Sequence, residues 1–247
     1  MKWFCSFLCF FWCVPLHAEQ ITVVAASDLM APISEIVQQF ERETGHQVRV
    51  TLGSSGNFYA QILNGAPFDV FLSADVNYPK ELEKAGRAVS GSTFVYGVGQ
   101  IALWTTKDSK IDVKALGMKA LMMPAVKKIA IGNPEHAPYG RAAVAAMQKT
   151  NVYEYVKDKL VLGENISQAA QFVHSGAADV GIIALSIAVS APMQQSGVYW
   201  IVPRNTYPPL EQGAVLLKHG GTAAKVFHEW LRSPAAVRIL AQYGFQR

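Results

Sequence analysis

Three short polar segments, each following an apolar run, hold the residues best suited to chemistry. They are residues 25–28 (AASD), 53–57 (GSSGN) and 133–140 (NPEHAPYG), and residues 164–167 (ENIS) have the same character. If each segment opens a helix, its free backbone N–H groups and its serine hydroxyls form an anion site, because a helix N-terminus carries partial positive charge. Alternatively, the Ser and Asp side chains only cap these helices, which is a common role for them.

Basic side chains are missing from these segments. None of them contains a Lys or Arg before its expected helix, and Arg141 comes one residue after the third segment. An anion bound there would therefore be held by backbone dipoles and hydroxyl groups rather than by an ion pair.

Enzymatic patterns fit the sequence poorly. Residues 53–57 differ from the G-x-S-x-G nucleophile elbow at Asn57. Residues 228–232 (HEWLR) lack the second histidine of the zinc motif H-E-x-x-H. A serine hydrolase that uses Ser55 with His136 stays open, because the members of a catalytic triad are neighbours in space and not in sequence. We expect a binding protein with no catalytic residue, no cofactor and no directly ligated metal.

The segments between these loops alternate between strand and helix patterns. Apolar runs predict strands, and residues spaced three or four apart predict helices between them. This alternation is typical of parallel sheets covered by helices. Residues 64–70 and 175–180 share a Gly-then-Asp pattern before a strand, which indicates either a common loop type or two lobes wound alike. Strands are expected at residues 21–25, 47–52, 68–72, 100–105, 128–132 and 180–185.

The first 18 residues have the layout of a secretory signal peptide. Lys2 precedes an apolar stretch that ends in a small residue, which predicts cleavage after Ala18. The stretch is shorter than the roughly 20 residues that a membrane-spanning helix needs. All three cysteines lie in this segment, so the mature chain has no thiol. We expect a soluble protein exported to a bacterial periplasm.

The composition excludes several classes of protein. Hydrophobic residues make up 51% of the chain and charged residues 16%, which argues against disorder and against a coiled coil. The net charge of +4 is small and scattered, so a nucleic-acid partner is not expected. A chain of 247 residues, less the signal peptide, has room for two modest domains.

Taken together, five segments resemble the periplasmic molybdate-binding proteins of ABC transporters, over nearly the whole mature chain. The resemblance implies an α/β, two-lobed periplasmic-binding-protein fold of type II. Each lobe would hold a mixed, mostly parallel sheet flanked by helices, with the ligand in the cleft between lobes. Lobe I is expected at residues 19–98 plus 205–247, and lobe II at residues 99–204. The five segments are residues 25–29, 53–56, 65–75, 132–140 and 243–245.

The resemblance also implies a function. The protein would capture molybdate, and tungstate as well, and deliver it as a monomer to the membrane permease of an ABC transporter. Selectivity against sulfate would come from cavity size, because both ions are dianions near neutral pH. A binding protein for another oxyanion or for a small organic acid stays open as an alternative, although a ligand carboxylate usually attracts an arginine.

A set of ligand-binding residues follows from the same resemblance: Ser27, Asp28, Ser55, Tyr139 and Ile166. Tyr139 and Ile166 would each donate a backbone N–H. The N–H of Asp28 is expected to face the oxyanion while its side chain turns elsewhere, because a carboxylate repels an anion.

One further position departs from some relatives. They place a tyrosine hydroxyl in the site where this chain has Ala184. The resemblance therefore predicts a site without that ligand.

Overall fold

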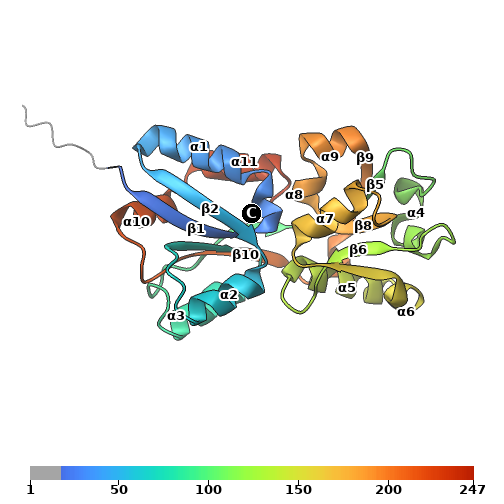
Figure 1. Ribbon diagram of the computed structural model, residues 1–247, viewed down its shortest axis with the longest axis horizontal. Coiled ribbons are helices and arrows are strands. Elements are labelled where there is room, and N and C mark those ends of the chain that lie inside the picture. Colours follow the sequence, from blue (N-terminus) through green and yellow to red (C-terminus); the bar gives the residue numbers. More distant parts are fainter. Residues whose placement is uncertain (1–17) are drawn as a thin grey trace, which may run out of the picture.

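Two separate five-stranded sheets organise the computed structural model, which describes residues 18–247. The expected signal peptide, apart from Ala18, lies outside the described residues. No helix among residues 18–247 is long and apolar enough to cross a membrane. Figure 1 shows the two sheets, with their helices, as two bodies side by side along the long axis of the molecule.

The first sheet has the strand order β2-β1-β3-β10-β4. Strand β1 pairs in parallel with β2 and β3, whereas β10 runs antiparallel to β3 and β4. The sheet is therefore mixed, with a single reversed strand. Its strands are β1 (Gln20–Ala26), β2 (Gln47–Gly53), β3 (Val70–Ser73), β4 (Phe94–Gly99) and β10 (Leu210–Leu216).

Helices cover both faces of this sheet because its central strands are apolar on both faces. Val23 packs in a cluster with Phe40 and Phe227, from the helices of one face, whereas its neighbour Val24 packs with Phe58 on the other. Successive residues of a strand point to opposite faces, so a doubly covered strand is a continuous apolar run. The helices are α1 (Ile33–Thr44), α10 (Thr222–Trp230) and α11 (Pro234–Gln242) on one face, and α2 (Ser55–Leu63) and α3 (Asn77–Lys84) on the other.

The second sheet has the order β7-β6-β8-β5-β9, and again one strand is reversed. Strand β6 pairs in parallel with β7 and β8, while β5 is antiparallel to β8 and β9. These strands are β5 (Ile101–Thr106), β6 (Ile129–Gly132), β7 (Leu160–Gly163), β8 (Val180–Ala184) and β9 (Gly197–Ile201).

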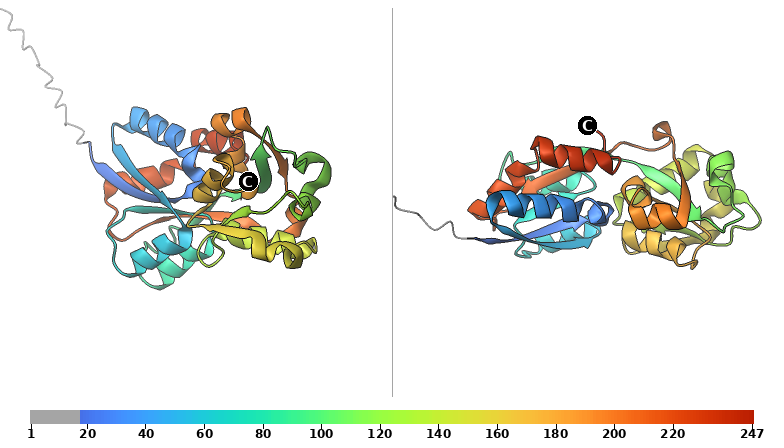
Figure 2. Two further views of the ribbon diagram at one scale, coloured as in Figure 1. Left: turned by 45° about the vertical axis from the view of Figure 1, so that its right-hand side comes forward. Right: turned by 90° about the horizontal axis from the view of Figure 1, so that it is seen from above.

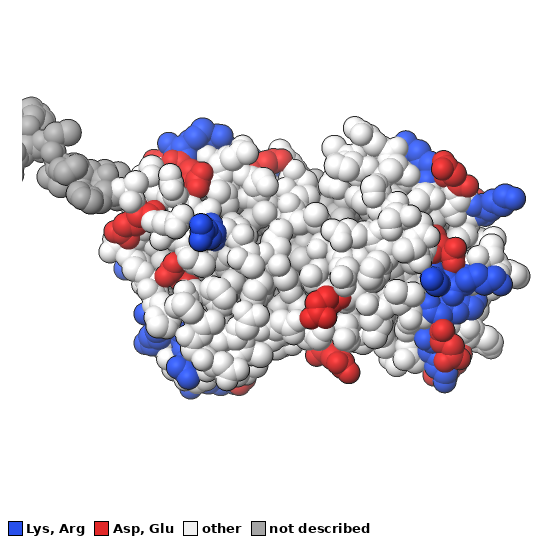
Figure 3. Space-filling model, in the orientation of Figure 1, with Lys and Arg blue, Asp and Glu red and all other residues white. Residues whose placement is uncertain are grey.

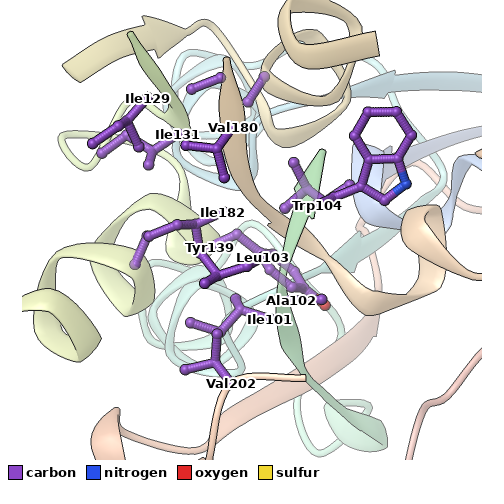
Figure 4. Close-up of a cluster of buried hydrophobic side chains, with 14 of the residues drawn as sticks. Ile101, Ala102, Leu103, Trp104, Ile129, Ile131, Tyr139, Val180, Ile182 and Val202 are labelled. Atoms are coloured by element: carbon purple, nitrogen blue, oxygen red, sulfur yellow. The ribbon is translucent and has the colours of Figure 1, made fainter. Parts of the chain in front are cut away.

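The core of this second half surrounds β5, β6 and β8. Trp104 is fully buried and belongs to a cluster with aliphatic side chains of the neighbouring strands, several of which Figure 4 labels. The two larger helices, α5 (Pro138–Lys149) and α7 (Ile166–His174), pack on the sheet through small side chains such as Ala143 and Ala169, which allow close approach. Short helices complete this half: α4 (Val113–Leu116), α6 (Tyr153–Val156), α8 (Leu185–Ala188) and α9 (Ala191–Ser196).

The chain passes twice between the two halves. Gln100 alone separates β4 from β5, and residues 202–209 lead from β9 back to β10. The side chain of Gln100 donates to the Gly244 carbonyl oxygen at 2.9 Å, which ties the first crossing to the C-terminal segment. Seen from above in Figure 2, the two bodies meet at a narrow junction.

The predicted strands are all present, with ends shifted by at most two residues. Strands β4, β7, β9 and β10 were not predicted. Strand β10 was missed because Glu211, Gln212 and Gly213 interrupt its apolar pattern. Residues 25–28 are expected to open a helix, and the helix that begins there is a short 3-10 helix (Ser27–Met30), with α1 following at Ile33.

Candidate functional site

A small pocket lies where loops of the two halves meet, and we call it the loop pocket. All five of the predicted ligand residues line it: Ser27, Asp28, Ser55, Tyr139 and Ile166. Its cavity volume is small, about 10 Å³. Its other lining residues are Ala26, Gly53, Ser54, Ala74, Ala137 and Pro138, so no Lys or Arg of the described chain lines it.

Three helix N-termini converge on the loop pocket. Helix α2 begins at Ser55, α5 at Pro138 and α7 at Ile166. The first backbone N–H groups of a helix have no acceptor within it. Proline has no N–H, so Tyr139 holds the first donor of α5, and Ile166 holds the first donor of α7. The pocket is therefore lined by the positive ends of three helix dipoles.

The hydroxyl group of Ser55 is buried and already has one partner. Its oxygen accepts a hydrogen bond from the Ala74 backbone N–H at 2.9 Å. Because a hydroxyl has one proton to donate, that proton stays free for an acceptor in the pocket. The alternative that Ser55 only caps α2 is not what the structure has, since Ser54 occupies the N-cap position and no side chain caps this helix.

Ser27 links the two halves across the pocket. Its hydroxyl donates to Asn165 Oδ1 at 3.2 Å and accepts from the Ser167 backbone N–H at the same distance. Asn165 also caps α7, because its Oδ1 accepts from the Gln168 N–H at 3.0 Å. For Ser27 to donate to an anion in the pocket, its hydroxyl would have to turn away from Asn165.

The carboxyl group of Asp28 is fully buried and turned toward hydrogen-bond donors. Its Oδ2 accepts from the Tyr139 hydroxyl at 2.9 Å and from Gln212 Nε2 at 2.6 Å. Its Oδ1 has no hydrogen-bond partner among the described residues. Burial raises the pKa of Asp28 to about 6, and the bonds from Gln212 and Tyr139 offset only part of that shift.

The Asp28 contacts belong to a larger buried cluster that the sequence did not reveal. Gln212 Nε2 also donates to the Tyr139 hydroxyl oxygen at 2.8 Å, and the Tyr96 hydroxyl donates to Gln212 Oε1 at 2.6 Å. We call Asp28, Tyr96, Tyr139 and Gln212 the carboxyl cluster. Burial raises the pKa of both tyrosines well above the ordinary value, so both stay protonated donors. The one feature of the sequence that could have indicated this cluster is Gln212, a polar residue next to the apolar residues 214–217.

The rim of the loop pocket is closed by contacts between residues 54–56 and His136. The Gly56 backbone N–H and the Ser54 hydroxyl both donate to the His136 carbonyl oxygen, at 2.9 and 2.6 Å. The His136 ring contacts Ser54 Oγ at 2.9 Å, and not Ser55. The pairing required by the serine-hydrolase alternative is therefore not formed, and the Ser54 proton is donated to a carbonyl oxygen instead.

Arg141 is the basic residue nearest to the predicted loops, and it is engaged elsewhere. Its guanidinium lies 2.7 Å from Asp75 Oδ2 and 3.3 Å from the Tyr78 hydroxyl, and it is not among the pocket-lining residues. On the face shown in Figure 3, basic side chains gather toward the two ends of the molecule, and only acidic ones interrupt the uncharged middle. Ala184, where some relatives place a tyrosine, is the fully buried last residue of β8.

Known proteins resemble this chain over nearly all of its described length. Residues 21–246 match the family model of bacterial extracellular solute-binding proteins. The molybdate-binding protein ModA of Rhodobacter capsulatus is 41% identical over 94% of this chain and 90% of its own length. A ModA of Azotobacter vinelandii is also 41% identical, over 93% of this chain and 90% of its own.

A solved structure shows the same architecture. The Azotobacter vinelandii periplasmic molybdate-binding protein superposes with a TM-score of 0.85 at 35% identity, covering 92% of this chain and 99% of that one. The predicted two-lobed α/β fold is thereby confirmed, and so is the resemblance indicated by the loop motifs.

Proposed function

This chain belongs to the family of bacterial extracellular solute-binding proteins, and from that premise we propose that it captures molybdate and delivers it to an ABC transporter permease. The members of this family are solute-binding proteins and not enzymes. The observation that carries the proposal is the loop pocket, where three helix N-termini meet and no basic side chain of the described residues is present.

Neutral donors suit a tetrahedral dianion in a closed site. Each hydrogen bond to a charged acceptor is stronger than one to a neutral group, and it strengthens further when water is excluded. In this proposal Ser27 and Ser55 donate hydroxyl protons, whereas Asp28, Tyr139 and Ile166 donate backbone N–H groups. Tungstate, which has the same charge and shape, is the second ligand that we propose.

Selectivity against sulfate would come from size. A smaller tetrahedral oxyanion cannot reach donors from every wall of a rigid pocket at once. Each buried donor left without an acceptor costs about 1–3 kcal/mol. An organic acid suits the site less well, because Arg141, the nearest candidate for its carboxylate, is paired with Asp75.

The proposal extends to organisation and location. We propose that residues 19–98 with 205–247 form lobe I, that residues 99–204 form lobe II, and that the ligand closes the lobes by hinge motion at the two crossings. The strand order of each sheet supports this division. We further propose that the signal peptide is cleaved after Ala18 and that the mature protein acts in the periplasm as a monomer.

The test is a parallel calorimetric titration of residues 19–247 with molybdate, tungstate, sulfate and phosphate. We expect tight binding of molybdate and tungstate and no heat from the other two. If none of the four ions binds, the proposed function is wrong. If sulfate binds as tightly as molybdate, the proposed selectivity by size is wrong. Light scattering of the same sample, with and without molybdate, measures the molar mass and so tests whether the protein is a monomer.

A further inference from the structure

The loop pocket and the carboxyl cluster share two residues, Asp28 and Tyr139. Tyr139 lines the pocket, and its hydroxyl donates to Asp28 in the cluster. Asp28 lines the same pocket, and none of its contacts with the described residues is with a cation. If the Asp28 N–H binds the oxyanion, as proposed above, an ionised carboxylate on the same residue would place two like charges close together.

Water and dissolved salt do not screen the repulsion between the two charges, because the Asp28 side chain is fully buried. Two like charges in a low-dielectric site repel each other strongly, and protonation of one of the two groups removes this repulsion. Molybdate and tungstate are weakly basic dianions near neutral pH, so the proton goes to the carboxyl group. We infer that Asp28 takes up one proton when the oxyanion binds, so that the liganded protein holds a neutral carboxylic acid beside its anion. This inference rests on the proposed function.

The surroundings of Asp28 suit a carboxyl group that changes its protonation state. Tyr139 from α5 and Tyr96 from β4 are the titratable groups that face it, and Gln212 from β10 is a neutral donor. The Ser186 hydroxyl of α8 donates to the Asp28 backbone oxygen at 2.7 Å, which holds the residue in place. The backbone N–H groups of Asp28 and Leu29 also favour the ionised carboxyl group, but Oδ1 has no hydrogen bond of ordinary geometry among the described residues, so it can take the proton without displacing Gln212 or Tyr139.

Because the pKa of Asp28 in the unliganded protein is already raised to about 6, a modest further rise in this pKa is enough to protonate the carboxyl group near neutral pH. A dianion beside the carboxyl group raises its pKa further. Between the pKa values of the free and liganded states, binding is linked to the uptake of about one proton. The affinity then falls by up to about tenfold for each unit of rising pH in that window.

The experiment is a titration of the wild-type chain with molybdate in buffers of different ionisation enthalpy, at several pH values between about 6.5 and 8.5. The slope of the observed enthalpy against the buffer ionisation enthalpy counts the protons taken up. We expect a slope close to one proton per ion at the centre of the window. A zero slope with intact binding would overturn the inference, whereas a complete lack of binding would overturn the proposed function instead.

Variants assign the proton to a residue. Asp28→Asn should bind molybdate without proton uptake and with an affinity that no longer falls with pH. Glu81→Gln removes one negative charge from the surface, where the side chain is half exposed, and should leave the proton count unchanged. His136 is a titratable group at the pocket rim. Uptake that persists in Asp28→Asn and disappears in His136→Asn would overturn the assignment to Asp28.

The count of protons taken up by the wild-type protein does not depend on the variants. If Asp28→Asn does not fold, the carboxylic-acid C=O stretch in the infrared difference spectrum of the wild-type protein replaces it. A positive acid band on adding molybdate is expected, and its absence would overturn the inference.

Discussion

Gly56 and His136 touch across the rim of the loop pocket through their backbones. The Gly56 N–H donates to the His136 carbonyl oxygen at 2.9 Å, and a Cβ atom added at Gly56 would lie 2.8 Å from that same oxygen and from His136 Cβ. Only a residue without a side chain allows this approach. The contact joins the N-terminus of α2 to the loop before α5, so in the hinge motion proposed above it would form only in the closed state.

Gly56→Ala should therefore oppose closure. The new methyl group overlaps backbone atoms that cannot move aside, so molybdate binding should weaken by about 1–3 kcal/mol. The free energy of unfolding should change little, because the clash is relieved when the halves separate. Calorimetry measures the first quantity and chemical denaturation the second. Gly221→Ala is the matched control, since its nearest neighbour is Glu19 Oε2 at 3.8 Å. Unchanged affinity in Gly56→Ala would show that this rim contact does not form in the liganded state.

Ser55→Ala should weaken molybdate binding by about 1–3 kcal/mol, because it removes a hydroxyl donor to a charged acceptor. It should also lower the free energy of unfolding, because the buried Ala74 N–H loses its acceptor. Ser190→Ala, which removes a hydroxyl bonded to the Ile187 carbonyl oxygen, is the control for loss of a hydroxyl elsewhere. An affinity equal to that of the wild type would remove Ser55 from the site.

Salt should have little effect on binding. No Lys or Arg of the described residues lines the loop pocket, so there is no ion pair between protein and ligand for salt to screen. Titrations from low to high sodium chloride should give molybdate affinities within about threefold of each other. A steep, continuous loss of affinity would indicate that a basic side chain does bind the ion.

The unliganded protein should show a pH-dependent stability that traces to Asp28. Its pKa is raised from 3.8 to about 6, so the folded state binds the proton more tightly than the unfolded state does. The free energy of unfolding should therefore fall as pH rises from about 4 to 6, by roughly 3 kcal/mol from this group. Asp28→Asn should remove that contribution, as seen in the difference between the two denaturation curves across pH. Parallel curves for variant and wild type would contradict it.

His228 should act in the opposite direction over an overlapping range. Burial lowers its pKa from 6.5 to about 4, so the unfolded state binds the proton more tightly. Its contribution to stability is present above about pH 6.5 and is lost as pH falls toward 4. His228→Leu keeps an apolar side chain against Phe94 and should flatten this part of the profile. If the wild-type slope persists in His228→Leu, another group is responsible.

Particular residues show how far the sequence alone could go. The helix starts at Pro138 and Ile166 follow from a proline at the first position of α5 and from the Asn165 cap of α7, which are local properties of the chain. These same positions carry loop motifs, and the resemblance of those motifs to molybdate-binding proteins implied the candidate ligand residues. Strands β1 and β3 could be predicted because strands covered on both faces are continuous apolar runs.

Only the tertiary structure decided which distant residues meet. Gln212 lies 184 positions from Asp28, and no local pattern relates them, yet β10 returns between β3 and β4 and brings the amide to the carboxyl group. The same holds for the contact of Ser54 with His136, 82 positions away. Local propensity depends on neighbours in the chain, whereas pairing across a sheet or a cleft depends on how the whole chain folds. The sequence alone therefore determined the central strands and the candidate donors, and the fold decided that the Asp28 carboxyl group lies buried beside them.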